Sequence, residues 1–278
     1  MKTGVATMER QKIVSREYKV MLLASRFRGD ENKLLESAGV LWKDFSKSIA
    51  DIVLQTKGDL QEVKSRRLIT FFDTRKRRLN EGGYIFRERR DVENSKREVT
   101  LKFRHRDRNV TQDRNMDARR QKRAETKFEE DIKAPFISLY SFSTTVGIAD
   151  KKPLKQMRHV VRLFPNIVER LDGFSDDEAI GAVNDFSARE LVLTGGSMRI
   201  GKNPKTDAGC ALIVWYNEGN RRDTPCAVEF SYRYGDEREA YDGTAARRAG
   251  DVFDMLNRNF TDWVDSKSRT KTNVAYGD

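Results

Sequence analysis

The sequence predicts an α+β fold in which an antiparallel β-barrel of about eight strands is surrounded by helices. Several segments alternate charged and uncharged residues at every second position, which is the period of a strand with two different faces. Two longer segments, 31–56 and 243–264, instead repeat apolar residues at helical spacing. Each strand alone is typical of a sandwich with a solvated outer face. Charged faces on strand after strand together favour a barrel with a charged interior.

The N-terminal half is expected to alternate strands with one long helix. That helix follows Asp30, whose side chain is suited to cap the first free backbone N–H groups. Its apolar stripe should pack against the barrel. The expected elements are a polar leader at 1–11, strands at about 12–22, 66–73, 84–91 and 97–106, the helix at 31–56, and a turn or short helix at 75–80.

The C-terminal half is expected to close the barrel. The Gly195-Gly196 pair, inside an otherwise apolar strand, suggests a bulge or a close approach of two backbones. The expected elements are strands at about 124–132, 188–200, 208–217 and 225–234, a mainly helical insert at 153–186, and a helix at 243–264. We interpret that last helix as a plug or a side support of the barrel, and residues 1–278 as one domain.

The most informative segment, 72–104, carries three cations on predicted strands. Arg87 and Arg89 are two residues apart, so their side chains point to the same face of one strand. Lys102, on the next strand along the chain, can join them on that face. Three cations on one face repel each other unless an anion lies between them. Phosphate is the anion that such a group is best suited to bind.

Composition favours an anionic partner without identifying it. The formal net charge is +11, from 54 Lys and Arg against 43 Asp and Glu. The segment 103–124 is rich in arginine and lacks apolar periodicity. It is either a solvated hairpin extension or a basic lip that attracts anionic substrates or contacts RNA. It lacks the interleaved aromatic residues typical of proteins that bind single strands.

The sequence also bears on compartment and on other kinds of site. No apolar run approaches the length of a transmembrane helix, and the N-terminus lacks the apolar region of a signal peptide. Cys210 and Cys226 occur in strand-like apolar contexts and are expected to be reduced thiols. His105 and His159 have no partner at metal-ligand spacing. We therefore expect a cytoplasmic protein with no membrane contact.

The order of these motifs resembles that of the CYTH superfamily, also called triphosphate tunnel metalloenzymes. This family includes class IV adenylyl cyclases, thiamine triphosphatases and inorganic tripolyphosphatases. It has a Glu-x-Glu-x-Lys strand, a strand ending in Tyr-Phe-Asp-Thr, an Arg-x-Arg strand and a strand ending in Thr-Leu-Lys. The matching positions here are 15–19, 71–74, 87–89 and 100–102. The resemblance implies that the barrel is a tunnel that encloses a triphosphate.

The resemblance also implies roles for individual residues. Glu17, Lys19 and Glu129 would be catalytic, and Glu17, Glu129 and Glu229 would hold Mg²⁺ or Mn²⁺. The residues expected to bind substrate phosphates are Lys19, Arg87, Arg89, Lys102 and Lys127. Mg²⁺ usually keeps several waters and takes one or two carboxylates together with substrate phosphates.

The chain departs from the family pattern at three acidic positions. Ser15 replaces the first Glu of the opening motif, and Ser231 replaces the last Glu of the closing one. The strand that begins near Cys210 also lacks an expected acid. The missing carboxylates could be replaced from elsewhere, for example by Glu190, Asp207 or Glu218.

Three functions are therefore open. The first is a metal-dependent phosphohydrolase acting on inorganic triphosphate or a nucleoside triphosphate. The second is a nucleotide cyclase or lyase of the class IV adenylyl cyclase type, which would release pyrophosphate. The third is a catalytically reduced protein that binds a nucleotide, polyphosphate or RNA end, and the serines at 15 and 231 argue for it. Tunnel folds often pair, so a homodimer is an open alternative to a monomer.

Overall fold

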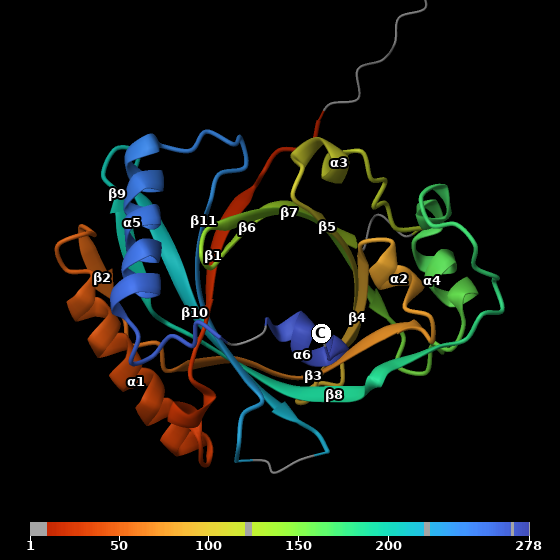
Figure 1. The fold of residues 1–278 in the computed structure, drawn as a ribbon, viewed down its shortest axis with the longest axis horizontal. Coiled ribbons are helices and arrows are strands. Elements are labelled where there is room, and N and C mark those ends of the chain that lie inside the picture. The colour runs from red at the N-terminus through yellow and green to blue at the C-terminus, as the bar shows by residue number, and fades with distance from the viewer. Residues whose placement is uncertain (1–9, 120–123, 220–222, 268–269, 278) are drawn as a thin grey trace, which may run out of the picture.

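The fold is a closed β-barrel with helices packed on its outside (Figure 1). The computed structural model describes residues 10–119, 124–219, 223–267 and 270–277. The strands are β1 (Ser15–Met21), β2 (Gln55–Lys57), β3 (Glu62–Thr74), β4 (Tyr84–Asp91), β5 (Arg97–His105), β6 (Ala124–Lys133), β7 (Ile137–Ile148), β8 (Ile180–Thr194), β9 (Ser197–Gly201), β10 (Thr206–Asn217) and β11 (Ala227–Gly235). The helices are η1 (Ala24–Phe27), α1 (Glu31–Ser48), α2 (Arg78–Glu81), α3 (Arg108–Gln112), α4 (Met157–Leu163), η3 (Pro165–Glu169), α5 (Gly243–Asn259) and α6 (Lys271–Tyr276).

Nine strands form the ring, in the order β11-β1-β6-β7-β5-β4-β3-β8-β10, and the pairing of β10 with β11 closes it. β9 and β2 extend the sheet beyond β10. The predicted barrel is confirmed, but its predicted strand number and uniform antiparallel pairing are not. Neighbours in a ring can all run in opposite directions only if their number is even. Nine strands therefore force a parallel pair, which here is β1 with β6.

The extra strand is β7, which the sequence analysis did not predict. It carries few charges, and its inward positions are taken by serine and threonine, so it lacked the charge alternation that marked the other strands. The predicted strand at 188–200 is in fact β8 followed by β9. The turn between them contains Gly195, which has a φ of +103°. A Cβ on Gly58 would lie 1.7 Å from the carbonyl oxygen of Gly195, so the expected close backbone approach is present.

Helices α1 and α5 lie on one side of the barrel and α4 on the opposite side, all outside the ring (Figure 1). α1 and α5 pack against β1, β9, β10 and β11, and Phe45 of α1 meets Phe230 of β11 edge-on, with ring centroids 4.8 Å apart. α4 and η3 cover β4 and β5, where Phe164 lies 6.2 Å from Phe86. No helix in the described ranges is long and apolar enough to cross a membrane.

The helix boundaries differ from the expected ones. α1 ends at Ser48, and the chain then turns into the short strand β2, which occupies the end of the predicted helix at 31–56. In the insert expected at 153–186, helix ends at Glu169 and β8 begins at Ile180. In the helix expected at 243–264, α5 ends at Asn259. Helix α6 was not predicted from the sequence, and it lies within the outline of the ring in Figure 1.

Candidate functional site

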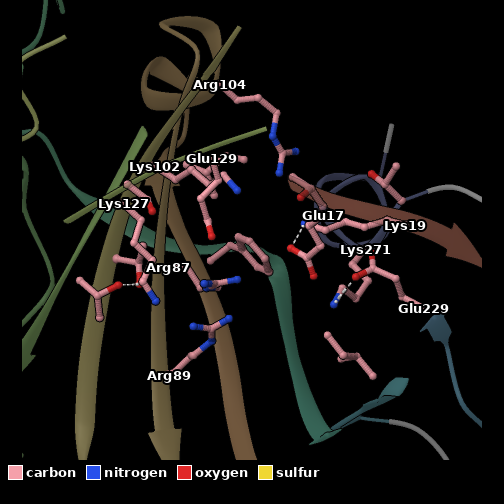
Figure 2. Close-up of a pocket in the computed structure, with 18 of the residues that line it drawn as sticks. Glu17, Lys19, Arg87, Arg89, Lys102, Arg104, Lys127, Glu129, Glu229 and Lys271 are labelled. Carbon is pink, nitrogen blue, oxygen red and sulfur yellow. Dashed lines mark hydrogen bonds and ion pairs between the residues drawn. The ribbon is translucent and has the colours of Figure 1, made fainter. Parts of the chain in front are cut away.

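A cavity of about 420 Å³ occupies the interior of the barrel. Residues that alternate along most strands of the ring line it, together with the beginning of α6. All eight residues to which the sequence analysis assigned a catalytic, phosphate-binding or metal-binding role lie on this lining: Glu17, Lys19, Arg87, Arg89, Lys102, Lys127, Glu129 and Glu229. Their places on β1, β4, β5, β6 and β11 bring them into one space, as Figure 2 shows.

Arg87 and Arg89 lie side by side on β4 and are only weakly compensated by carboxylates (Figure 2). Arg87 makes no ion pair within the described chain, and the Nε atoms of both arginines are buried without a hydrogen-bond partner. The nearest carboxylate contact of Arg89 is to Glu98, at 3.8 Å. Burial and the neighbouring Arg89 lower the pKa of Arg87 to about 9. The pair is therefore arranged to receive an anion.

Asp131 is the centre of a buried ionic cluster that the sequence analysis did not assign to the site. Its carboxylate accepts hydrogen bonds from Lys19 Nζ at 2.8 Å, from Lys102 Nζ at 3.0 Å, and from Arg104 Nη2 at 3.0 Å. Ser141 Oγ adds a fourth hydrogen bond at 2.7 Å, and the side chain has no exposed surface. Burial alone would raise the pKa of Asp131, but the three cations hold it well below its usual range. The alternation of charges from 125 to 131 was the signal that could have revealed it.

Glu190 is the centre of a second cluster in the barrel wall. It pairs with Arg67, and Trp215 Nε1 donates a hydrogen bond to its Oε2 at 2.8 Å. Although burial acts to raise the pKa of Glu190, Arg89 and Arg67 lower it to about 2. Asp207 instead pairs with Arg199 at 2.8 Å, and Glu218 is exposed. None of the three carboxylates considered as replacements lines the cavity.

Each of the three predicted metal ligands already has a partner. Lys19 Nζ lies 2.8 Å from Glu17 Oε2, and Lys271 Nζ lies 3.0 Å from Glu229 Oε1. Glu129 accepts a hydrogen bond from Ser15 Oγ at 2.7 Å. Within the described ranges, no group of three or more acidic, histidine or cysteine side chains is placed to hold a metal ion. Because ammonium groups already neutralise Glu17 and Glu229, the residues as arranged leave neither carboxylate free for a divalent cation. The metal site that the resemblance implied stays a prediction.

Several cations of the cavity were not foreseen as site residues. They are Arg67, Arg104, Lys133, Arg233 and Lys271. Arg104 belongs to the basic segment 103–124, and it points to Asp131 inside the barrel. Lys127, which was foreseen, pairs with Glu125 at 2.7 Å near the surface, so it is less available to a ligand than Arg87.

The basic segment 103–124 is only partly a free basic surface. Arg108 forms two hydrogen bonds with Glu239, at 2.7 and 2.8 Å. Arg114 lies over the ring of Phe103, at 4.3 Å from its centroid. Residues 120–123 lie outside the described ranges. The expected contact with RNA stays a prediction.

Comparison with known proteins yields distant likenesses to solved structures. No family model matches the chain, and no curated protein sequence matches it. Among solved structures, a proposed adenylyl cyclase from Hippeastrum, described as having a dominant triphosphatase activity, is 13% identical with a TM-score of 0.45. That alignment covers 96% of this chain and 97% of the other.

Two bacterial structures, both proposed adenylate cyclases, are similar at 10% identity. The protein from Vibrio parahaemolyticus has a TM-score of 0.36, and the alignment covers 95% of this chain and 98% of the other. The protein from Bacillus halodurans has a TM-score of 0.37, with 96% and 98% covered. Likenesses as distant as these do not identify the function of this chain.

Proposed function

We propose that the protein binds a triphosphate-bearing molecule, either inorganic triphosphate or the triphosphate of a nucleotide, inside the barrel. The observation that carries this proposal is the placing of Arg87 and Arg89 in the cavity with unpartnered Nε groups. Arg87 has no ion pair in the described chain, and Arg89 meets Glu98 only at 3.8 Å. Burying weakly compensated charges is costly, so a fold that retains two of them side by side gains from a ligand that neutralises them. A planar guanidinium can donate two parallel hydrogen bonds to phosphate oxygens.

The charge of the whole lining supports a ligand with several negative charges. Among the described residues, ten cations line the cavity: Lys19, Arg67, Arg87, Arg89, Lys102, Arg104, Lys127, Lys133, Arg233 and Lys271. Five carboxylates line it: Glu17, Glu98, Glu125, Glu129 and Glu229. The excess of five positive charges falls to three when the buried Asp131 and Glu190 are included. A single phosphate would not offset this excess as well as a chain of phosphates.

A hydrolytic reaction is the second candidate function, because carboxylates and cations face the same space. Glu129 lies on β6 and Glu17 on the adjacent β1, across the ring from Arg87 on β4. The cations would stabilise charge on the terminal phosphoryl group, and a carboxylate could orient a water molecule for attack on it. Metal-assisted hydrolysis would further require Lys19 and Lys271 to release their carboxylates.

An assay of product release separates these functions. The protein would be incubated with ATP, GTP or inorganic triphosphate in Mg²⁺, Mn²⁺ or chelator, while orthophosphate and pyrophosphate are measured separately. A hydrolase should release orthophosphate, and Glu129→Gln should reduce the rate by about a hundredfold or more, as expected for loss of a group that acts in the transition state. Glu130→Gln is the matched control, because Glu130 lies next in β6 but pairs with Arg16 instead of lining the cavity.

Each outcome of that assay has a separate meaning. Release of pyrophosphate together with a cyclic nucleotide would indicate a cyclase. No release, together with binding detected by calorimetry, would leave the protein as a binder of triphosphates. If none of the three anions binds under any of these conditions, the proposed function is wrong.

Binding should weaken as the pH rises from about 7 to 9. Burial and the nearby Arg104 lower the pKa of Lys133 to about 7. Burial also lowers the pKa of Lys102 to about 8, with Arg104 and Lys19 adding to the effect. Above these values the free protein has lost two positive charges, whereas a bound anion would favour the charged forms. Calorimetry at pH 8 in two buffers of different ionisation enthalpy should detect proton uptake on binding, and its absence would contradict this assignment.

A further inference from the structure

Two of the three predicted metal ligands, Glu17 and Glu229, are paired with ammonium groups of the protein itself. Figure 2 shows Glu17 beside Lys19, and Glu229 beside Lys271, on the side of the cavity opposite Arg87 and Arg89. Lys271 also lies 5.5 Å from the ring centroid of Trp215, so its charge sits between a carboxylate and an aromatic ring. Its side chain is 15% exposed, and that of Glu229 is 10% exposed. The pair is therefore an internal feature of the barrel.

The segment that brings Lys271 into the barrel is firmly attached there. Ala275 and Tyr276 of α6 are each 1% exposed and pack in the same cluster as Phe71 and Trp215. Asn184 Nδ2 donates hydrogen bonds to the carbonyl oxygens of both α6 residues, at 3.2 and 2.8 Å. Lys271 is thus a fixed cation, unlike a lysine on a flexible surface tail.

Lys19 is fixed between two carboxylates on the same side of the cavity. Its Nζ lies 2.8 Å from Glu17 Oε2 and 2.8 Å from Asp131 Oδ1. Burial would lower the pKa of Lys19, but Asp131 and Glu17 together raise it above its usual value. The ammonium therefore stays charged throughout the physiological range of pH.

The two serines that replace expected acids fit this arrangement. Ser15 Oγ donates a hydrogen bond to Glu129, so a donor stands at a position where a carboxylate would repel Glu129. Ser231 lies directly opposite Lys19 in the pairing of β1 with β11. Two expected carboxylates are thus absent from a region that also contains the ammonium group of Lys271. Both changes reduce the negative charge available to a divalent cation.

We propose that Lys19 and Lys271 take the place of a divalent cation between the carboxylates and the phosphate chain, so that the cavity binds triphosphate without a metal ion. This inference rests on the proposed function and assigns Lys271 as a phosphate-contacting residue. A tethered ammonium offers three N–H donors and one charge at a fixed position. It can donate to phosphate oxygens on one side while Glu229 remains on the other.

The first test needs only the unaltered protein. Calorimetry with inorganic triphosphate would be done once in excess chelator and once in excess Mg²⁺. We expect binding in chelator to be at least as tight as in Mg²⁺, because Mg²⁺ masks the anion that the lysines bind. Binding that requires Mg²⁺, or that is about tenfold or more tighter with it, would overturn the inference while leaving the proposed function standing. Absence of binding in both conditions would overturn the proposed function itself.

The second test uses Lys271→Gln, with Lys267→Gln as the matched control. Lys267 lies four residues earlier in the same segment and is exposed. In chelator, Lys271→Gln should weaken triphosphate binding by about tenfold, and Mg²⁺ should now restore part of the affinity, because Glu229 has lost its partner. Lys267→Gln should bind as the unaltered protein does. Unchanged binding by a folded Lys271→Gln variant would contradict the role of Lys271.

Discussion

Replacing Arg87 by alanine should weaken triphosphate binding by about tenfold to a hundredfold while leaving the protein at least as stable. A hydrogen bond to a charged group contributes about 1.5–3 kcal/mol, and every 1.4 kcal/mol is a factor of about ten in affinity. Arg87 would donate such bonds from the interior of the cavity. Calorimetry with inorganic triphosphate measures the change in affinity.

Most substitutions lower the stability of a protein. Arg87→Ala is expected to leave it unchanged or to raise it. Arg87 makes no ion pair in the described part of the chain, and its burial beside Arg89 lowers its pKa to about 9. The free protein therefore loses an unfavourable buried charge when the guanidinium is removed. Thermal unfolding without ligand should show an equal or higher midpoint, and the rise in midpoint caused by triphosphate should shrink.

Arg90→Ala is the matched control for this prediction. Arg90 is in the same strand but pairs with the exposed Asp150 at 2.7 Å and does not line the cavity. Its removal should change neither affinity nor stability beyond the small effect of a surface ion pair. A loss of folding in Arg87→Ala with preserved binding would show that Arg87 is a structural residue.

The sequence alone treats Arg87 and Lys102 as equivalent, and the structure separates them. Both positions follow from the period of two along a strand, which is a local property that any strand displays. The partners of these residues depend on which strands become neighbours. Lys102 donates a hydrogen bond to Asp131 at 3.0 Å, whereas Arg87 has no such partner in the described chain. Substitution of Arg87 therefore removes a positive charge without breaking an ion pair among the described residues, whereas substitution of Lys102 would also break its contact with Asp131.

The site residues that could not be predicted from the sequence are those whose positions depend on contacts between segments far apart in the chain. Lys271 reaches Glu229 from a short helix far along the chain, and α6 has too few residues to show an apolar stripe. β7 contributes Ser143 and Thr145 to the cavity, but it was not predicted as a strand because it lacks the alternation of charged residues. The cationic face of β4 and β5 needed no such contacts, so it could be foreseen from local spacing alone.

Asp131→Asn should be the most destabilising single change at the site, lowering the free energy of unfolding by about 3–5 kcal/mol. Breaking a buried ion pair by removing one partner leaves an uncompensated charge, and that is the usual size of the loss. Here the carboxylate of Asp131, which has no exposed surface, forms ion pairs with Lys19, Lys102 and Arg104. Urea unfolding measures the change, and added triphosphate should recover part of it by neutralising the released cations.

The pH dependence of this loss provides an independent check. The three cations hold the pKa of Asp131 well below that of an aspartate in an unfolded chain, which is about 3.9. The carboxylate therefore contributes its full stabilisation above about pH 4 and loses it progressively as the pH falls further. The difference in stability between the unaltered protein and Asp131→Asn should shrink in acid. A difference that stays constant down to about pH 2 would mean that the amide disturbs packing and that the charge of Asp131 is not what holds the cluster together.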